Sequence, residues 1–258
     1  MTLALSFSIL FFALGAIVAS FLGVVASRLY TGVPWFSGRS HCDSCGATLT
    51  FYDLAPILSW LASSARCRHC GSRISALLPL SEAVLGTLFL LAYMQLGLSI
   101  LLVLFLAALS LLAAIVFYDL QHTVIPNIFS LPFALVSIAF AACSAASVVA
   151  FGWMFLIAGS IALSLAALHF LSRGRAMGLA DAPVAFSLAL LAGPFAFSGF
   201  VYSFWIGAIV GIFILLRAPK GHRMGIEVPF APFLAAGFLL ALFSGWNVLT
   251  FITWFTIH

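Results

Sequence analysis

Charge is scarce in this sequence. Only 6% of the 258 residues are charged, with ten basic and six acidic side chains, whereas 65% are hydrophobic and the mean hydropathy is +1.27. Soluble domains carry about 25% charged residues, so this composition excludes an ordinary soluble domain and indicates an integral membrane protein. The formal net charge of +4 does not indicate nucleic-acid binding, because the basic residues lie beside apolar segments.

Other familiar patterns are also missing. The apolar runs are continuous and do not alternate with polar residues, which excludes a transmembrane β-barrel and favours an all-α helical bundle. No glycine-rich phosphate loop and no dinucleotide fingerprint is present. The first run, Leu3 to Ala26, has no basic residue before it, so we interpret it as a retained span and not as a cleaved secretory signal.

The apolar runs predict about eight transmembrane helices. All ten basic residues fall in the loops at 28–76, 172–181 and 217–229, and the connections near 97, 148 and 198 carry none. By the positive-inside rule, the three basic loops are expected in the cytoplasm and both termini outside. The expected spans are 3–26, 77–96, 98–118, 128–147, 150–171, 182–197, 200–216 and 230–249.

Four of the five cysteines form two CxxC pairs in the first basic loop: Cys42, Cys45, Cys67 and Cys70. A glycine follows each pair, which suits two tight turns that present sulfurs to a common centre. Four thiolates in this spacing predict a tetrahedral structural zinc site. Redox-active cysteines or two disulfides are the alternatives. A polar loop this small would need the metal in order to fold.

Two aspartates are the candidate catalytic residues. Asp119 ends the uncharged stretch from Leu98 to Tyr118, and Asp181 lies in the segment 177–181. The predicted topology puts both at cytoplasmic helix ends, where two carboxylates facing one water could act as general base and general acid. The alternative is two unrelated acids, or part of a proton path. Gly178 and Ala180, which leave room for a substrate, and Glu82, an acid early in a predicted span, are assigned to substrate binding.

With these residues in view, the chain resembles the type IV prepilin peptidases, membrane aspartic proteases of bacterial pilus and type II secretion systems. The resemblance rests on six segments that occur in this order along the chain. They are ALGAIVASFLGVVASRL at 13–29, the paired-cysteine loop with FYDLAPILSWL at 51–61, SARCRHCGSRIS at 64–75 running into LLPLSEAV at 77–84, Asp119 with Ile125-Pro126-Asn127 and MGLAD at 177–181, and VPFAPFLAAG at 228–237.

The resemblance implies a multi-pass enzyme of the bacterial inner membrane whose active site faces the cytoplasm. Its substrate would be a prepilin or pseudopilin, cleaved after a glycine by Asp119 and Asp181. The new N-terminus would then be methylated with S-adenosylmethionine, a step that the family links to the cysteine loop. The expected division is therefore a first helix at 1–27, a zinc loop at 28–76 and a peptidase bundle at 77–258, with membrane lipid as a further partner.

The chain departs from the family pattern at several positions. The GxGD motif reads Gly178-Leu179-Ala180-Asp181, and Pro183 replaces a lysine; in the zinc loop, Asp43 and Leu54-Ala55 also differ. An added Cβ at position 180 would narrow the approach of a substrate if the backbone there is tight. The alternative function is therefore a catalytically altered paralogue, acting as a zinc-loop scaffold in pilus or secretion assembly.

Overall fold

The computed structural model describes residues 2–31, 39–175, 177–217 and 228–248, and these residues are helical with no strand. The predicted all-α class is confirmed. The only β-type pairs among them are two isolated bridges in the cysteine loop. The elements, in chain order, are α1 Thr2–Arg28, η1 Phe51–Asp53, α2 Leu58–Ala62, α3 Leu77–Leu96, α4 Ile100–His122, α5 Asn127–Ser144, α6 Val148–Leu171, α7 Asp181–Ala192, η2 Gly193–Phe195, α8 Ala196–Arg217 and α9 Ala231–Ser244.

Each predicted apolar run corresponds to a helix, but the helices differ in length. Six helical stretches of the described chain are long and apolar enough to cross a bilayer, and one of them is the 37-residue stretch from Asp181 to Arg217. That stretch comprises α7, η2 and α8, which Gly193 (φ 53°) and Pro194 separate. α9 is a shorter apolar helix of 14 residues. Residues 218–227 of the third basic loop lie outside the described residues, with Lys220 and Arg223.

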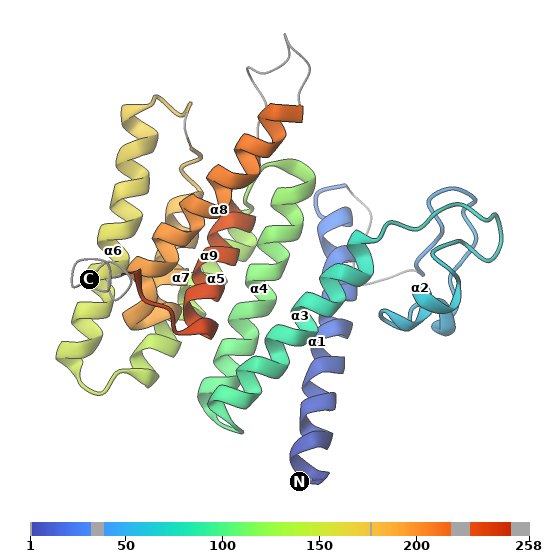
Figure 1. Cartoon of the computed structure of the whole chain (residues 1–258), viewed down its shortest axis with the longest axis horizontal. Helices are drawn as coiled ribbons and strands as arrows, with labels where there is room; N and C mark the ends of the chain where they lie inside the picture. Colours follow the sequence, from blue (N-terminus) through green and yellow to red (C-terminus); the bar gives the residue numbers. More distant parts are fainter. Residues whose placement is uncertain (1, 32–38, 176, 218–227, 249–258) are drawn as a thin grey trace, which may run out of the picture. The chain divides into compact units, whose positions relative to one another are not determined.

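The chain forms two compact units, residues 1–102 and 103–258. In the first unit, α1 and α3 pack together at two glycines (Figure 1). A Cβ on Gly15 would lie 2.7 Å from the carbonyl oxygen of Leu85, and one on Gly86 would lie 2.8 Å from that of Phe12. Small residues at such contacts let membrane helices approach closely, and van der Waals packing then holds them together.

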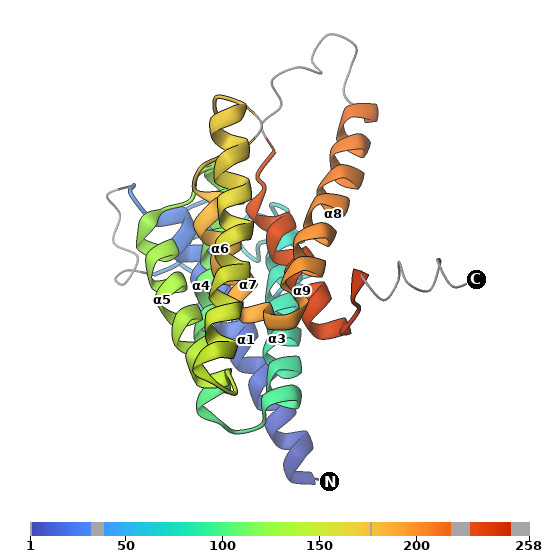
Figure 2. The same ribbon diagram turned by 90° about the vertical axis from the view of Figure 1, so that its left-hand side faces the viewer.

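In the second unit, α7 is the central helix and contacts α5, α6, α8 and α9 (Figure 2). Ten of its twelve residues are buried, which explains why it is apolar on every side. α8 and α9 lie side by side in both views (Figures 1 and 2) and pack where Gly237 meets Ser203. The first residue of α7 is Asp181, so the fold places a carboxylate at one end of the core of this unit.

Candidate functional site

Asp119 lies in the last turn of α4 and is only 4% exposed. Its Oδ2 accepts a hydrogen bond from the backbone N–H of Ala231 at 3.1 Å. Ala231 is the first residue of α9 and Pro232 follows it, so this N–H has no partner within its own helix. Asp119 therefore caps the N-terminus of α9. The sequence analysis missed this contact, although Pro232 is a signal for a helix start.

Asp181 begins α7 and is 6% exposed. The loop residue Gly178 lies directly beside it, because a Cβ on Gly178 would be 3.2 Å from Oδ2 of Asp181. That distance is shorter than nearly all real Cβ contacts, so a side chain at 178 would push the carboxylate away. Gly178 itself is exposed, and it opens one side of an otherwise buried acid.

Both aspartates are buried in the second unit of the fold. Asp119 and Asp181 are close enough for their carboxylates to interact electrostatically, although 61 residues separate them in the sequence. Asp181 stands in the first turn of α7 and Asp119 caps α9, so two helix N-termini point their partial positive charge at the pair. The two N-termini favour ionised carboxylates, whereas the C-terminal end of α4, which carries Asp119, opposes them.

The loop before Asp181 is fastened to the end of α6. The ring Nδ1 of His169 lies 2.8 Å from the carbonyl oxygen of Met177, and the backbone N–H of Gly174 donates to the carbonyl of His169 at 2.8 Å. No motif in the sequence marks His169. His169 is thus a positioning residue for the segment that carries Gly178 and Asp181.

The two departures next to Asp181 leave the backbone unstrained. Ala180 has φ −67° and ψ −16°, a helical conformation that any residue adopts, so position 180 does not require glycine. Pro183 is exposed and occupies the first turn of α7, where its missing N–H would have no helical partner. Both residues fit the backbone that carries Asp181.

Glu82 has its hydrogen-bond partner in the cysteine loop. It is 3% exposed in α3, and its Oε2 accepts a hydrogen bond from the backbone N–H of Ile57 at 2.7 Å. Ile57 has φ 60°, a conformation that is unfavourable for a β-branched residue. Glu82 thereby fixes the start of α2 against α3. Its assignment to substrate binding stays a prediction.

The four cysteines gather as expected. The sulfur atoms of Cys42, Cys45, Cys67 and Cys70 all lie within 4.8 Å of one another, and those of Cys42 and Cys70 are 3.9 Å apart. Zinc–sulfur bonds of about 2.3 Å in a tetrahedron give sulfur–sulfur separations of about 3.8 Å. All four are free thiols, which is contrary to a pair of disulfides. The group is therefore a site that can hold a metal ion.

The two halves of this cysteine site are built alike. The N–H of Gly46 donates to the carbonyl of Cys42, and the N–H of Gly71 donates to that of Cys67. Both glycines have φ near 70°, so each turn needs a residue that tolerates the left-handed region. Antiparallel bridges, His41 with Thr48 and Arg66 with Arg73, close the two turns.

The electrostatics of the thiols fit a cation. Hydrogen bonds from the backbone N–H groups of Cys45 and Ser44 lower the pKa of Cys42 to about 6. The pKa of Cys45 is about 11: the N–H of Ala47 lowers it, but burial and the thiols of Cys70 and Cys42 together raise it more. Neighbouring thiols thus resist ionising side by side. A divalent ion would remove that conflict, which is the chemistry expected of a four-thiolate metal site.

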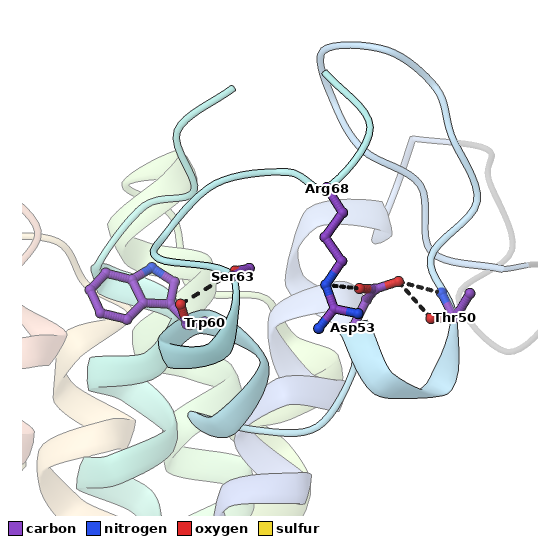
Figure 3. A network of polar contacts seen from close by, with 5 residues as sticks. All are labelled: Thr50, Asp53, Trp60, Ser63 and Arg68. Atoms are coloured by element: carbon purple, nitrogen blue, oxygen red, sulfur yellow. Dashed lines mark hydrogen bonds and ion pairs between the residues drawn. The ribbon is translucent and has the colours of Figure 1, made fainter. Parts of the chain in front are cut away.

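A polar network braces the same loop (Figure 3). Asp53 Oδ2 accepts hydrogen bonds from the backbone N–H and the hydroxyl of Thr50, and its Oδ1 lies 3.4 Å from Nε of Arg68. The Thr50 hydrogen bonds, together with the charge of Arg68, lower the pKa of the Asp53 carboxyl. Asp53 therefore ties the η1 turn to the second cysteine turn.

Comparison with known proteins places the chain in a family. Residues 13–96 match the model described as the bacterial peptidase A24 N-terminal domain. The prepilin leader peptidase/N-methyltransferase of Bacillus subtilis (strain 168) is 31% identical over 248 residues, which cover 93% of this chain and 95% of that protein. The protein of the same name from Burkholderia pseudomallei (strain 1026b) is 32% identical over 270 residues, covering 90% and 84%.

A third relative matches over a shorter length. The prepilin leader peptidase/N-methyltransferase of Myxococcus xanthus (strain DK1622) is 41% identical over 135 residues, which are 52% of this chain and 40% of that protein. No solved structure matches the chain. The span-length helices and these relatives fit a multi-pass protein of the inner membrane. The chain belongs to the prepilin leader peptidase/N-methyltransferase family.

Proposed function

We propose that this chain is a membrane aspartic endopeptidase that removes the leader of a prepilin or pseudopilin at the cytoplasmic face. The observation that carries the proposal is the buried, electrostatically interacting pair Asp119 and Asp181 at two helix N-termini. The names of its relatives support prepilin processing as the reaction. The basic loops at 28–76 and 172–181 support the cytoplasmic orientation.

In the proposed mechanism the two carboxylates hold one water and share one proton. The ionised carboxylate takes a proton from the water as its oxygen attacks the carbonyl carbon of the scissile peptide bond. The protonated carboxyl gives its proton to the carbonyl oxygen. Collapse of the tetrahedral intermediate breaks the C–N bond. One hydroxyl of the intermediate returns its proton to the carboxylate that had acted as acid, and the leaving amine receives the proton that the base had taken. Gly178 and Ala180 leave room for the substrate backbone beside Asp181.

Zinc, in this proposal, has a structural role only. Cys42, Cys45, Cys67 and Cys70 would hold it, and four thiolates leave no open position for a substrate or a water. We also propose that the processed N-terminus is methylated, as the relatives' names imply. S-adenosylmethionine would supply the methyl group.

Co-expression with a candidate prepilin tests the proposal. The processed protein should lack its leader, and its N-terminal residue should carry the mass of one added methyl group. Asp119→Asn and Asp181→Asn should each leave the prepilin at full length. Cleavage that persists in either variant would contradict the dyad mechanism, and an uncleaved prepilin with the wild-type chain would favour the scaffold function. Cleavage without the added mass would remove only the methylation.

A further inference from the structure

The cysteine loop exposes a set of large apolar side chains around its short helix. Tyr52 is 79% exposed, Leu54 41%, Leu58 68% and Leu61 60%. Lipid covers the exposed apolar residues of membrane-spanning helices, but α2 has only five residues and is too short to cross a bilayer. In a loop surrounded by water, such a group of apolar side chains would be unfavourable. We call these four side chains the α2 apolar face.

The depth of α2 identifies the partner. The bond from Ile57 to Glu82 fixes the start of α2 to a residue that lies five positions after the first residue of α3. At the helical rise of about 1.5 Å per residue, this point is about 7.5 Å along the helix axis from the first residue of α3. Interfacial helices are immersed by about 5–10 Å at the boundary between headgroups and acyl chains. Figure 1 shows α2 level with the first half of α3.

A second contact keeps the apolar face turned outward. The indole N–H of Trp60 donates to the carbonyl oxygen of Ile74 at 3.3 Å. This side of α2 therefore faces the segment that leads into α3. Leu58 and Leu61 lie on either side of Trp60 in the sequence, and both are exposed. The helix is thus bound to its own unit through Trp60 and Ile57 and is open on its leucine side.

The charge around this face matches an anionic membrane surface. Residues 28–76 contain five arginines and only two aspartates. Arg66 and Arg73 are both exposed and lie opposite each other across an antiparallel bridge. Lysine and arginine near an anionic leaflet are each attracted to it by about 1 kcal/mol. Exposed apolar side chains and exposed arginines on one loop beside a membrane span are the pattern of an interfacial anchor.

We propose that the α2 apolar face is immersed in the headgroup region of the bilayer and that Arg66 and Arg73 contact lipid phosphates. The cysteine loop then lies against the membrane surface instead of projecting into the cytoplasm. This inference needs only a chain that spans the membrane, so it does not depend on the proposed peptidase activity.

Depth-dependent fluorescence quenching tests the proposal. The full chain carries an environment-sensitive fluorescent amino acid at position 61 or, as a matched control, at the exposed Thr48 of the first cysteine turn. The chains are placed in nanodiscs of phosphatidylcholine with phosphatidylglycerol. Both are checked for equal zinc content, which reports a folded loop. Quenchers are aqueous iodide and lipids that carry a nitroxide at the headgroup or at carbon 5.

The label at position 61 should be quenched by both nitroxide lipids and should show roughly a fivefold lower iodide constant than position 48, because a side chain at interfacial depth is withdrawn from the aqueous phase. Arg66→Gln with Arg73→Gln should raise iodide quenching at 61 in these nanodiscs but not in pure phosphatidylcholine. Equal iodide quenching at 61 and 48 would overturn the proposal. Shielding of position 61 from iodide and from lipid nitroxides alike would also overturn it, since another protein surface would then cover α2.

Discussion

Asp119 has two separable roles in this structure, and two substitutions distinguish them. Its carboxylate is one half of the proposed catalytic pair, and its Oδ2 also caps α9 through the N–H of Ala231. Asp119→Asn keeps an oxygen that can accept this hydrogen bond but removes the acid. Asp119→Ala removes both. We expect both variants to lose leader cleavage, and only Asp119→Ala to lose substantial stability.

The size of the stability difference follows from the capping bond. Replacing an N-cap acceptor by alanine costs about 0.5–2 kcal/mol, and leaving a buried N–H unsatisfied costs about 1–3 kcal/mol. We take a loss of about 1–2 kcal/mol in the free energy of unfolding. Each kcal/mol lowers the Tm of a protein of this size by about 2–4 °C, so Asp119→Ala should unfold about 2–8 °C below Asp119→Asn. Scanning fluorimetry of the purified proteins in one mild detergent measures this difference.

Two results would refute this reasoning. If the alanine and asparagine variants unfolded at the same temperature, the bond to Ala231 would not stabilise α9. If Asp119→Asn cleaved the prepilin at the wild-type rate, Asp119 would be a cap and nothing more. A variant that fails to fold is recognised independently, because its zinc content and its elution volume would differ from those of the wild type.

Three further predictions address the loop, the helix packing and the effect of pH. Gly178→Ala should lower the cleavage rate about tenfold with little change in Tm, because its Cβ displaces a catalytic carboxylate by tenths of an ångström. The control Ala180→Gly, at an unstrained position, should change the rate less than twofold. Equal losses of cleavage rate in the two variants would contradict the geometry around Asp181. Gly237→Ala should destabilise the α8–α9 pair by about 1–3 kcal/mol, which would be measured as a lower Tm. Gly211→Ala is the control, because Gly211 has open space around it, and its Tm should equal that of the wild type. Equal Tm values for the two variants would contradict this prediction. Hydrogen bonds lower the pKa of the Asp53 carboxyl in the folded protein. The ionised carboxylate therefore stabilises the loop fully above the pKa of the unfolded state, about 4, and this stabilisation is lost as the pH falls through the lower pKa of the folded state. Hydrogen exchange of the 48–53 peptide, corrected for the intrinsic rate, measures this effect. At pH values below about 4, protection should decrease in the wild type but not in Asp53→Asn. The same decrease in both proteins would exclude Asp53 as the cause.

The sequence predicted the features that depend on local pattern. Continuous apolar runs predicted the helices, since a bilayer leaves the backbone few other choices. The two CxxC turns predicted the four-sulfur cluster, because each turn is built by its own glycine. The family, named from motifs such as MGLAD at 177–181, is confirmed by the relatives. The cytoplasmic orientation, the domain division and the roles of the site residues stay predictions.

Contacts between distant segments could not be predicted in this way. Nothing near Asp119 in the sequence shows that it caps α9, because that bond depends on how α4 and α9 pack. Glu82 was interpreted as a substrate-binding acid from its place in an apolar run, yet its carboxylate accepts the N–H of Ile57. The sequence predicted a connection near residue 198, and the structure places the break a few residues earlier, at Gly193, where φ is positive.

The most direct measurement is the initial rate of leader removal by purified wild-type chain and by Asp181→Asn, with a purified prepilin in the same lipid. A dyad that shares one proton requires both carboxylates, so we predict a rate for Asp181→Asn at least about a thousandfold below wild type, with unchanged Tm and zinc content. Asp181→Asn that is equally stable and still removes the leader at a rate near that of the wild type would contradict the account.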